Sequence, residues 1–217
     1  MIRLHHVPQS RSMRVLWLLH ELDLPAEVIV RPFDRTLRSA DYLELSPAGR
    51  VPALELDGEV LFESLAMMEY LCERHPGPLW RAPGSAQRAD WLNWLHFSET
   101  ISQHCATLTQ QHVVLREDHM RSPVLMQIEP KRIGKCYGAI EARLADGRDN
   151  LLGAFSAVDV AVGQAVYMAR HFARTDGFER TAQWYDRITA RPAFAASLPA
   201  AGEGLYPQDF YEPWGAG

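Results

Sequence analysis

The chain has 217 residues, 47% of them hydrophobic and 23% charged, which is enough to bury a substantial core in one or two domains. Lys and Arg number 22 against 27 Asp and Glu, so the net charge of −5 gives no reason to expect a nucleic-acid partner. Three scattered cysteines, the lack of a long apolar segment and an N-terminus without a signal-peptide core predict a cytoplasmic protein with no disulfide framework and no membrane span.

The N-terminal third alternates between strand and helix patterns. Residues 2–7 alternate apolar and polar side chains, as a strand with one buried face does. Residues 13–22 are too apolar for an exposed helix, and residues 27–30 form a second strand. This order predicts a right-handed parallel unit. The next residues, 34–49, are polar and irregular apart from one helical turn predicted at 40–45.

A short hairpin is predicted next. The extended runs 53–56 and 59–62 are joined by Asp57-Gly58, a dipeptide that suits a two-residue turn with positive φ at both positions. Pro52 directly precedes the first run. Because proline lacks an N–H, it predicts a sheet edge, a bend or a cis peptide bond at this point.

Glu63 and Ser64 open an apolar helix pattern over 65–73, with Ser64 at the predicted N-cap. Met67 stands where a capping box would place Glu or Gln, so the first amides of this helix stay available. A helix N-terminus with free N–H groups and a serine hydroxyl is a site for a carboxylate.

The second part of the chain has helical patterns only. A segment rich in Pro and Gly, about 76–85, predicts a linker and a domain boundary. Apolar residues then recur at helical spacing from Ser85 to Val113. Pro123 and Pro130 predict the two ends of an irregular stretch, and a further helix follows before Asp146-Gly147.

The last part begins with Ser156 and Asp159, spaced as a capping box at the head of a very apolar helix. Another core helix, 178–190, is ended by Pro192. The tail 198–217 either lies over a pocket mouth or packs on the first domain, and the sequence leaves both possibilities open. Its aromatic residues are Tyr206, Phe210, Tyr211 and Trp214.

Two of these motifs carry a resemblance to a known family. The order of Val51 to Leu54, a hairpin and then Glu63-Ser64 resembles the glutathione site of the cytosolic glutathione transferases. The pair Ser156 and Asp159 is similar to the motif that begins the core helix of that family. In the family the acidic residue of this motif is structural, so we expect Asp159 to stabilise the fold rather than to act in catalysis.

The resemblance covers nearly the whole chain and implies its fold. The order βαβ followed by ββα is that of an α/β thioredoxin-like N-terminal domain, here residues 1–78. The helical remainder, residues 86–217, then forms an all-α C-terminal domain, and the two together make the glutathione transferase fold. Family membership also implies a homodimer.

The resemblance further implies how glutathione binds. Pro52 forms a cis peptide bond, and the backbone of Val51 pairs with the cysteinyl part of glutathione like an added strand. Glu63 faces the ammonium group and Ser64 the carboxylate of the γ-glutamyl end. Glutathione is thus the expected co-substrate, and no metal is expected.

Weaker implications concern the glycyl end of glutathione and the pocket for the electrophile. Arg50 stands where many members carry Lys, so its guanidinium meets the glycyl carboxylate. Arg38 is a weaker candidate for that contact, and either arginine could equally be a solvated surface residue. His104, Cys105 and Leu108 are the expected pocket-facing positions for the electrophile, on the first long helix of the helical domain.

The loop after the first strand is the expected catalytic loop, because glutathione must be held as its thiolate to act as a nucleophile. Transferases of the serine-using classes carry the activating Ser four residues before an Arg, and Ser10 with Arg14 has that spacing. Ser12 is the alternative, or else simply an N-cap. Arg11 adds positive potential near the sulfur or points into solvent. The strand has no Tyr and the loop no Cys for the other catalytic classes.

These residues predict a dimeric glutathione transferase that stabilises the glutathione thiolate for attack on a small apolar electrophile, as in detoxification. One alternative is a glutathione-dependent isomerase or dehalogenase on the same fold. The other is a non-catalytic member that binds ligands or partner proteins.

Overall fold

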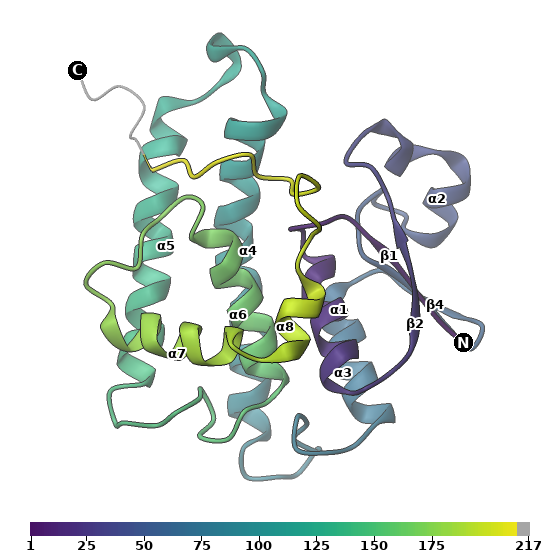
Figure 1. The fold of residues 1–217 in the computed structure, drawn as a ribbon, viewed down its shortest axis with the longest axis vertical. Helices are drawn as coiled ribbons and strands as arrows, with labels where there is room; N and C mark the ends of the chain where they lie inside the picture. The colour runs from purple at the N-terminus through teal and green to yellow at the C-terminus, as the bar shows by residue number, and fades with distance from the viewer. Residues whose placement is uncertain (212–217) are drawn as a thin grey trace. The chain divides into compact units, whose positions relative to one another are not determined.

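The computed structural model describes residues 1–211 (Figure 1). Within them, contacts divide the chain into two compact units. The first comprises Met1–Arg88 and Ile188–Leu205, and the second comprises Ala89–Arg187 and the chain from Tyr206 onward. In the part of the chain that the structure describes, no helix is both long enough and apolar enough to cross a membrane.

The first unit is built on a sheet whose strands, within residues 1–211, follow the order β2-β1-β3-β4. Asp57 and Gly58 have φ values of 52° and 92°, as the two-residue hairpin between β3 and β4 requires. β1 (Ile2–His6) is parallel to β2 (Ala26–Val30) and antiparallel to β3 (Ala53–Leu56), which pairs antiparallel with β4 (Glu59–Leu61). The predicted parallel unit and the predicted hairpin are therefore confirmed.

Two helices, α1 (Ser12–Glu21) and α3 (Ser64–Arg74), lie side by side along one face of this sheet (Figure 1). Every side chain of α1 from Ser12 to Leu19 is buried, and Trp17 is fully enclosed. Burial on all sides explains why this segment is more apolar than an exposed helix can be.

A segment from near the chain's end completes the burial of α1. The short helix α8 (Pro192–Ser197) packs on α1, and the ring of Phe194 meets that of Trp17 edge-on at a centroid distance of 4.9 Å. The guanidinium of Arg191 donates two 2.7 Å hydrogen bonds to the carboxylate of Glu21. Residues 170 or more positions apart in the sequence thus pack together.

The stretch between β2 and β3 folds against the end of the sheet. It contains the helical turn predicted at 40–45, α2 (Ala40–Leu45), and a 3₁₀ turn, Arg35–Arg38, that the sequence analysis did not predict. Leu37 and Tyr42 from these two elements are buried in one cluster with Val7 and Ala53 from the ends of β1 and β3.

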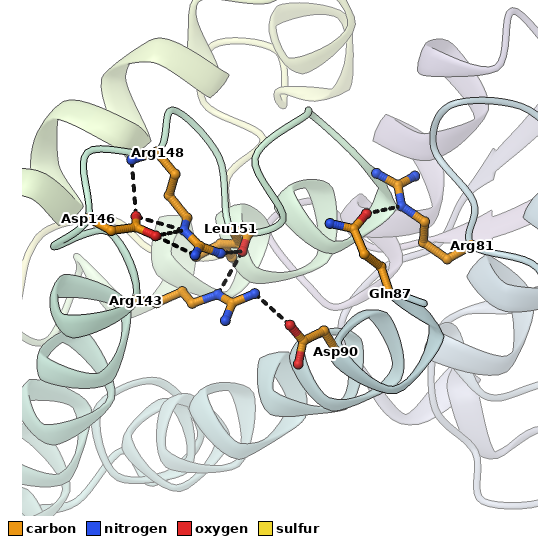
Figure 2. Close-up of polar contacts among 7 residues, drawn as sticks. All are labelled: Arg81, Gln87, Asp90, Arg143, Asp146, Arg148 and Leu151. Atoms are coloured by element: carbon orange, nitrogen blue, oxygen red, sulfur yellow. Dashed lines mark hydrogen bonds and ion pairs between the residues drawn. The ribbon is translucent and has the colours of Figure 1, made fainter. Parts of the chain in front are cut away.

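In the segment rich in Pro and Gly, one arginine side chain makes several hydrogen bonds. Arg81 donates to Oε1 of Gln87 at 2.8 Å (Figure 2). It also donates to the carbonyls of Pro78 and Trp80, at 2.8 and 2.9 Å. These bonds satisfy backbone carbonyls that a segment without helix or strand cannot pair internally.

The second unit is helical. Its almost wholly buried α6 carries the apolar residues of the core, as the sequence predicts. Its elements are α4 (Arg88–Thr109), a π-helical turn (Gln110–Val114), a 3₁₀ turn (Asp118–Met120), α5 (Pro123–Arg143), α6 (Ala157–Ala169) and α7 (Glu179–Thr189).

The irregular stretch predicted between Pro123 and Pro130 is wrong, because α5 begins at Pro123 and continues through Pro130. Pro123 occupies the first helical turn, where a missing N–H costs nothing. Pro130 lies inside the helix and removes one backbone bond. Met126 and Glu129, in the turn before it, are each only 3% exposed, so tertiary packing holds the helix across the proline.

The predicted capping box at the start of α6 is confirmed, with Ser156 as N-cap and Asp159 three residues later. Asp159 is fully buried and accepts hydrogen bonds from the N–H groups of Leu151 (3.0 Å) and Ser156 (2.9 Å). Its Oδ1 also accepts from Nε1 of Trp184, on α7, at 3.0 Å. The carboxylate therefore joins two helices and the preceding loop.

That loop is held from its other side as well (Figure 2). The carbonyl of Leu151 accepts from Nε of Arg143 at 2.8 Å and from Nη1 of Arg148 at 3.3 Å. Arg143 also pairs with Asp90 at 2.8 Å, and Arg148 with Asp146. Both polar groups of the Leu151 backbone are thus satisfied.

Candidate functional site

Three segments of the first unit meet at one end of the sheet. β1 and β3 pair as far as Ala53, and β3 and β4 pair as far as Leu61. Just beyond these residues β1 continues into the loop at Val7, β3 is preceded by Pro52, and β4 leads to Glu63. Because neighbouring strands keep their register, the catalytic-loop candidates lie beside the two predicted glutathione-binding segments.

The Val51–Pro52 peptide bond is cis, one of the three conformations that the sequence predicts. The backbone just before it is fixed by two side chains. Tyr42 donates its hydroxyl to the carbonyl of Arg50 at 2.9 Å, and Ser46 donates to the same oxygen at 2.7 Å. The N–H of Arg50 returns a 3.2 Å bond to Ser46 Oγ. Burial raises the pKa of Tyr42 to about 12, so its phenol stays a donor.

The start of α3 differs by one residue from the prediction. Ser64 is the first helical residue and Glu63 is the N-cap, because Glu63 is the last residue with an extended backbone. In residues 1–211 no side chain caps this end, and the ladder begins with Met67 N–H to the carbonyl of Glu63 at 2.9 Å. The amides ahead of that bond point out of the helix end. Ser64 is buried there and Glu63 is exposed.

The loop after β1 places its two serines in contact. Ser10 Oγ and Ser12 Oγ are 2.7 Å apart, and Ser10 Oγ also accepts the N–H of Ser12 at 3.2 Å. Ser12 is fully buried, whereas Ser10 is half-buried. Ser12 is the first residue of α1 and follows the N-cap position, Arg11, so it is not the N-cap considered above. Arg14 is fully buried in the first turn.

His6, at the end of β1, belongs to the same cluster. Its Nδ1 lies 2.8 Å from Ser12 Oγ. The ring is 4% exposed, and burial lowers the pKa of His6 to about 4. The imidazole is therefore neutral near pH 7 and carries one N–H.

His6, Tyr42 and Ser46 are not among the site residues predicted from the sequence. For His6 a signal was present, because it follows Ile2 and Leu4 in the alternation that marks the buried face of β1. For Tyr42 and Ser46 the sequence has no comparable signal, since their importance comes from contacts with the Arg50 carbonyl.

The predicted partners of the glycyl carboxylate, Arg38 and Arg50, are both exposed. Gly49, whose φ is 60°, directly precedes Arg50 in the chain and lies against Arg38. A Cβ at Gly49 would lie 2.8 Å from the carbonyl of Leu37 and 3.4 Å from Cγ of Arg38. The close approach that glycine permits therefore brings the two arginine-bearing turns together.

The predicted electrophile-pocket residues lie on α4 in the second unit. Cys105 and Leu108 are 0% exposed in that unit's core. His104 is half-buried, with Nδ1 2.6 Å from Oε2 of Glu129, which also pairs with Arg132 at 2.6 Å.

The tail is divided between the units. Gly204 belongs to the first, where a Cβ on it would lie 2.6 Å from Oε1 of Gln9. Gln9 has a φ of 57° and directly precedes Ser10, so this part of the tail contacts the candidate catalytic loop. Trp214 lies outside the described residues.

The tail residues from Tyr206 to Tyr211 belong to the second unit and pack within it. Tyr206 and Thr109 share a 2.9 Å hydroxyl contact, and the Phe210 N–H donates to the carbonyl of His171 at 2.6 Å. The Phe210 ring stacks on His112 at a centroid distance of 4.6 Å.

Among residues 1–211, no three or more His, Cys, Asp or Glu side chains are grouped so that they could hold a metal ion.

Comparisons with known sequences agree on one family. A sequence profile described as "Glutathione S-transferase, N-terminal domain" matches residues 4–79. The chain is 39% identical over 103 residues to "Glutathione S-transferase 3" of Schizosaccharomyces pombe, a match that covers 46% of the chain and 41% of that protein. It is 30% identical over 167 residues to the maleylacetoacetate isomerase of Pseudomonas aeruginosa, covering 75% of the chain and 77% of the isomerase.

Solved structures share the fold. A glutathione transferase from Methylococcus capsulatus has a TM-score of 0.79 and 27% identity, with 95% of this chain and 100% of that chain covered. A glutathione transferase family member from Pseudomonas fluorescens, crystallised with two glutathione molecules bound, has a TM-score of 0.80 and 22% identity, with coverage of 91% and 92%.

Proposed function

Because the chain belongs to the cytosolic glutathione transferase superfamily, we propose that it binds glutathione at the end of the β1-β3-β4 sheet and transfers its thiolate to a small apolar electrophile. One observation carries this proposal. The strand registers bring a loop with two hydroxyls, a cis-proline segment and an uncapped helix N-terminus to one edge of the first unit.

Each part of glutathione has a partner in this proposal. The backbone of Val51, held in place through the Arg50 carbonyl, pairs with the cysteinyl amide as an added strand does. The γ-glutamyl carboxylate binds Ser64 and the first amides of α3, where the helix dipole favours an anion. Glu63 binds the ammonium group, and exposed Arg50, with Arg38 as the alternative, binds the glycyl carboxylate.

Ser10 is the proposed catalytic residue. A free thiol has a pKa near 8.5, so a shift of about two pKa units, or roughly 2.7 kcal/mol, makes the thiolate dominant at neutral pH. A hydrogen bond to a charged group contributes about 1.5–3 kcal/mol, and a helix N-terminus adds about 0.3–2. One hydroxyl at the start of α1 is therefore sufficient. Half-buried Ser10 is nearer to solvent than fully buried Ser12, which favours Ser10 for direct contact with the sulfur.

The test combines binding and chemistry. Wild-type protein should be retained on immobilised glutathione and should conjugate a chromogenic electrophile. Ser10→Ala should bind glutathione normally, but the pKa of the bound thiol should rise by about one to two units, with rate lost at neutral pH and partly regained at higher pH. If glutathione does not bind, or if neither Ser10→Ala nor Ser12→Ala shifts the thiol, the serine-based proposal fails.

A second candidate function follows from the 30% identity to a maleylacetoacetate isomerase. An isomerase or dehalogenase would use the same thiolate to add to its substrate. A transferase and an isomerase differ in the fate of glutathione, since a transferase consumes it in the conjugate and an isomerase regenerates it at every turnover. Measuring glutathione consumption against product formation separates them. A member that binds glutathione but turns over no electrophile would be the non-catalytic alternative.

We also propose that half-buried His104 faces the electrophile pocket, that the fully buried Cys105 and Leu108 form the layer behind it, and that the protein is a homodimer. In the dimer implied by the family, the hairpin-to-helix region of one subunit meets the helical domain of the other, and this region exposes two apolar side chains, Val60 at 44% and Phe62 at 47%. A light-scattering mass of one 24.6 kDa chain at micromolar concentration would exclude the dimer.

A further inference from the structure

The buried hydroxyl of Ser12 lies in a hydrogen-bond chain that the proposed role of Ser10 does not explain. Ser12 Oγ is 2.7 Å from Ser10 Oγ and 2.8 Å from Nδ1 of His6. It is also 3.1 Å from both the N–H and the carbonyl oxygen of Val7. A hydroxyl has one hydrogen to donate and two lone pairs to accept with, so it can make only three of these contacts as hydrogen bonds at one time.

The donor and acceptor roles of the neighbouring groups limit which three contacts Ser12 Oγ makes as hydrogen bonds. The Val7 N–H can only donate, so it occupies one lone pair of Ser12. The Val7 carbonyl accepts the N–H of Ser10 at 3.2 Å and so does not depend on Ser12. The two shortest contacts, to Ser10 and His6, take the remaining places, and they can do so in two directions. Either His6 donates to Ser12 and Ser12 to Ser10, or Ser10 donates to Ser12 and Ser12 to His6.

We propose that bound glutathione selects the direction that starts at His6, so that His6 acts through Ser12 as a positioning residue for the thiolate. In that direction Ser12 supplies the hydrogen shared with Ser10, and the hydrogen of Ser10 can point to the sulfur. In the opposite direction Ser10 donates its one hydrogen to Ser12 and so cannot donate it to the sulfur. A thiolate can only accept hydrogen bonds, so it favours the first direction. This inference deepens the proposed function and depends on it.

The surroundings suit a donor chain rather than a proton acceptor. Ser12 and His6 are 0% and 4% exposed, so water does not compete for their bonds. Because burial holds the pKa of His6 near 4, the ring stays neutral and does not take the proton of the thiol, which leaves to solvent. Successive hydrogen bonds also polarise one another, so a donor at His6 strengthens the donor at Ser10.

The test measures the pKa of glutathione bound to each variant, from the ultraviolet absorbance of the thiolate. His6→Leu removes the donor, and Ser12→Ala breaks the chain. Each should raise the pKa of the bound thiol by roughly half a unit to one unit, less than Ser10→Ala. His6→Asn should restore much of the shift, because the asparagine amide can place an N–H near the position of Nδ1.

Two controls separate this chain of bonds from general damage. In the double variant Ser10→Ala/His6→Leu the thiol pKa should equal that of Ser10→Ala alone, because His6 acts only through Ser10. His5→Leu is the matched control, since His5 is also buried on β1 and its nitrogens contact Glu55 and Arg31. It should leave the thiol pKa unchanged.

The outcomes distinguish this inference from the proposed function. If Ser10→Ala shifts the thiol but His6→Leu and Ser12→Ala do not, the chain of bonds is refuted and the proposed function stands. If wild-type protein binds no glutathione, or binds it with an ordinary thiol pKa, both fail. Should His6→Leu not fold, nitrogen NMR on the wild-type complex decides, with His6→Asn assigning the signal among nine histidines. Hydrogen on Nδ1 of His6 is expected, and hydrogen on Nε2 alone would overturn the inference.

Discussion

Replacing Asp159 with alanine should destabilise the helical unit by about 3–5 kcal/mol, because it removes the acceptor of a buried hydrogen-bond network. The change leaves three buried N–H donors without their acceptor, those of Leu151, Ser156 and the Trp184 indole, and the Ser156 hydroxyl also loses a 3.3 Å contact. Each orphaned donor costs about 1–3 kcal/mol, or roughly 3–9 kcal/mol in sum. Burial raises the pKa of the Asp159 carboxyl, so relief of its desolvation returns part of that loss.

The assay is urea denaturation followed by circular dichroism, with wild type, Asp159→Ala and Asp159→Asn compared at pH 7. Asparagine keeps one oxygen acceptor but turns an NH₂ group toward a donor, so its stability should lie between the other two. Asp146→Ala is the control, because this carboxylate is exposed and pairs with Arg148 on the surface, where ion pairs contribute little. Its unfolding midpoint should stay close to that of wild type.

Each folded Asp159→Ala molecule should show normal glutathione chemistry, since every contact of Asp159 described above lies within the helical unit. A loss of less than 1 kcal/mol would show that water or repacking satisfies the orphaned donors. A variant as stable as wild type but inactive would refute the structural role altogether.

Three further expectations can be checked with the same protein. Ser64→Ala should weaken glutathione binding about ten- to hundredfold in calorimetry, from a lost bond of about 1.5–3 kcal/mol, and unchanged affinity would remove Ser64 from the site. Because the pKa of His6 is lowered to about 4, the unfolded chain binds the proton first, and stability should fall as pH drops from about 6.5 to 4. His6→Asn should lose roughly 2–3 kcal/mol less over that window in urea titrations, and an identical fall would contradict the assignment. In α5, Pro130→Ala should stabilise the protein against unfolding by about 1–3 kcal/mol. The control Gly134→Ala, where a Cβ meets open space, should stabilise it by about 0.5–1 kcal/mol. A less stable Pro130→Ala variant would mean that the proline ring is needed for packing.

Much of the fold could be predicted because its signals are local. The Asp57-Gly58 turn and the capping box at Ser156 each depend on a few consecutive residues, and both are confirmed. Pro130 misled the prediction for the opposite reason. Its local effect is to break a helix, but burial of Met126 and Glu129 on the core face outweighs one missing hydrogen bond.

The candidate site shows the same division. Strand order and hairpin register suffice to predict that the loop after β1, Pro52 and Glu63 come together at one edge. The support of that edge could not be predicted, since Tyr42 and Ser46 hold the cis-proline segment through a carbonyl oxygen eight and four residues away. A carbonyl is present at every residue, so no residue type marks the one that needs support.

Asp159 and Ser12 show why two buried polar groups can serve different ends. The groups around the Asp159 carboxylate described here all donate, so this network has one arrangement and contributes only stability. Around Ser12, the Ser10 hydroxyl and the His6 ring can each donate or accept. That network therefore has two arrangements of similar geometry, and a ligand that only accepts hydrogen bonds can choose between them. When the partners of a buried polar group can each donate or accept, a small anion can therefore reverse the direction of the hydrogen bonds without moving the backbone.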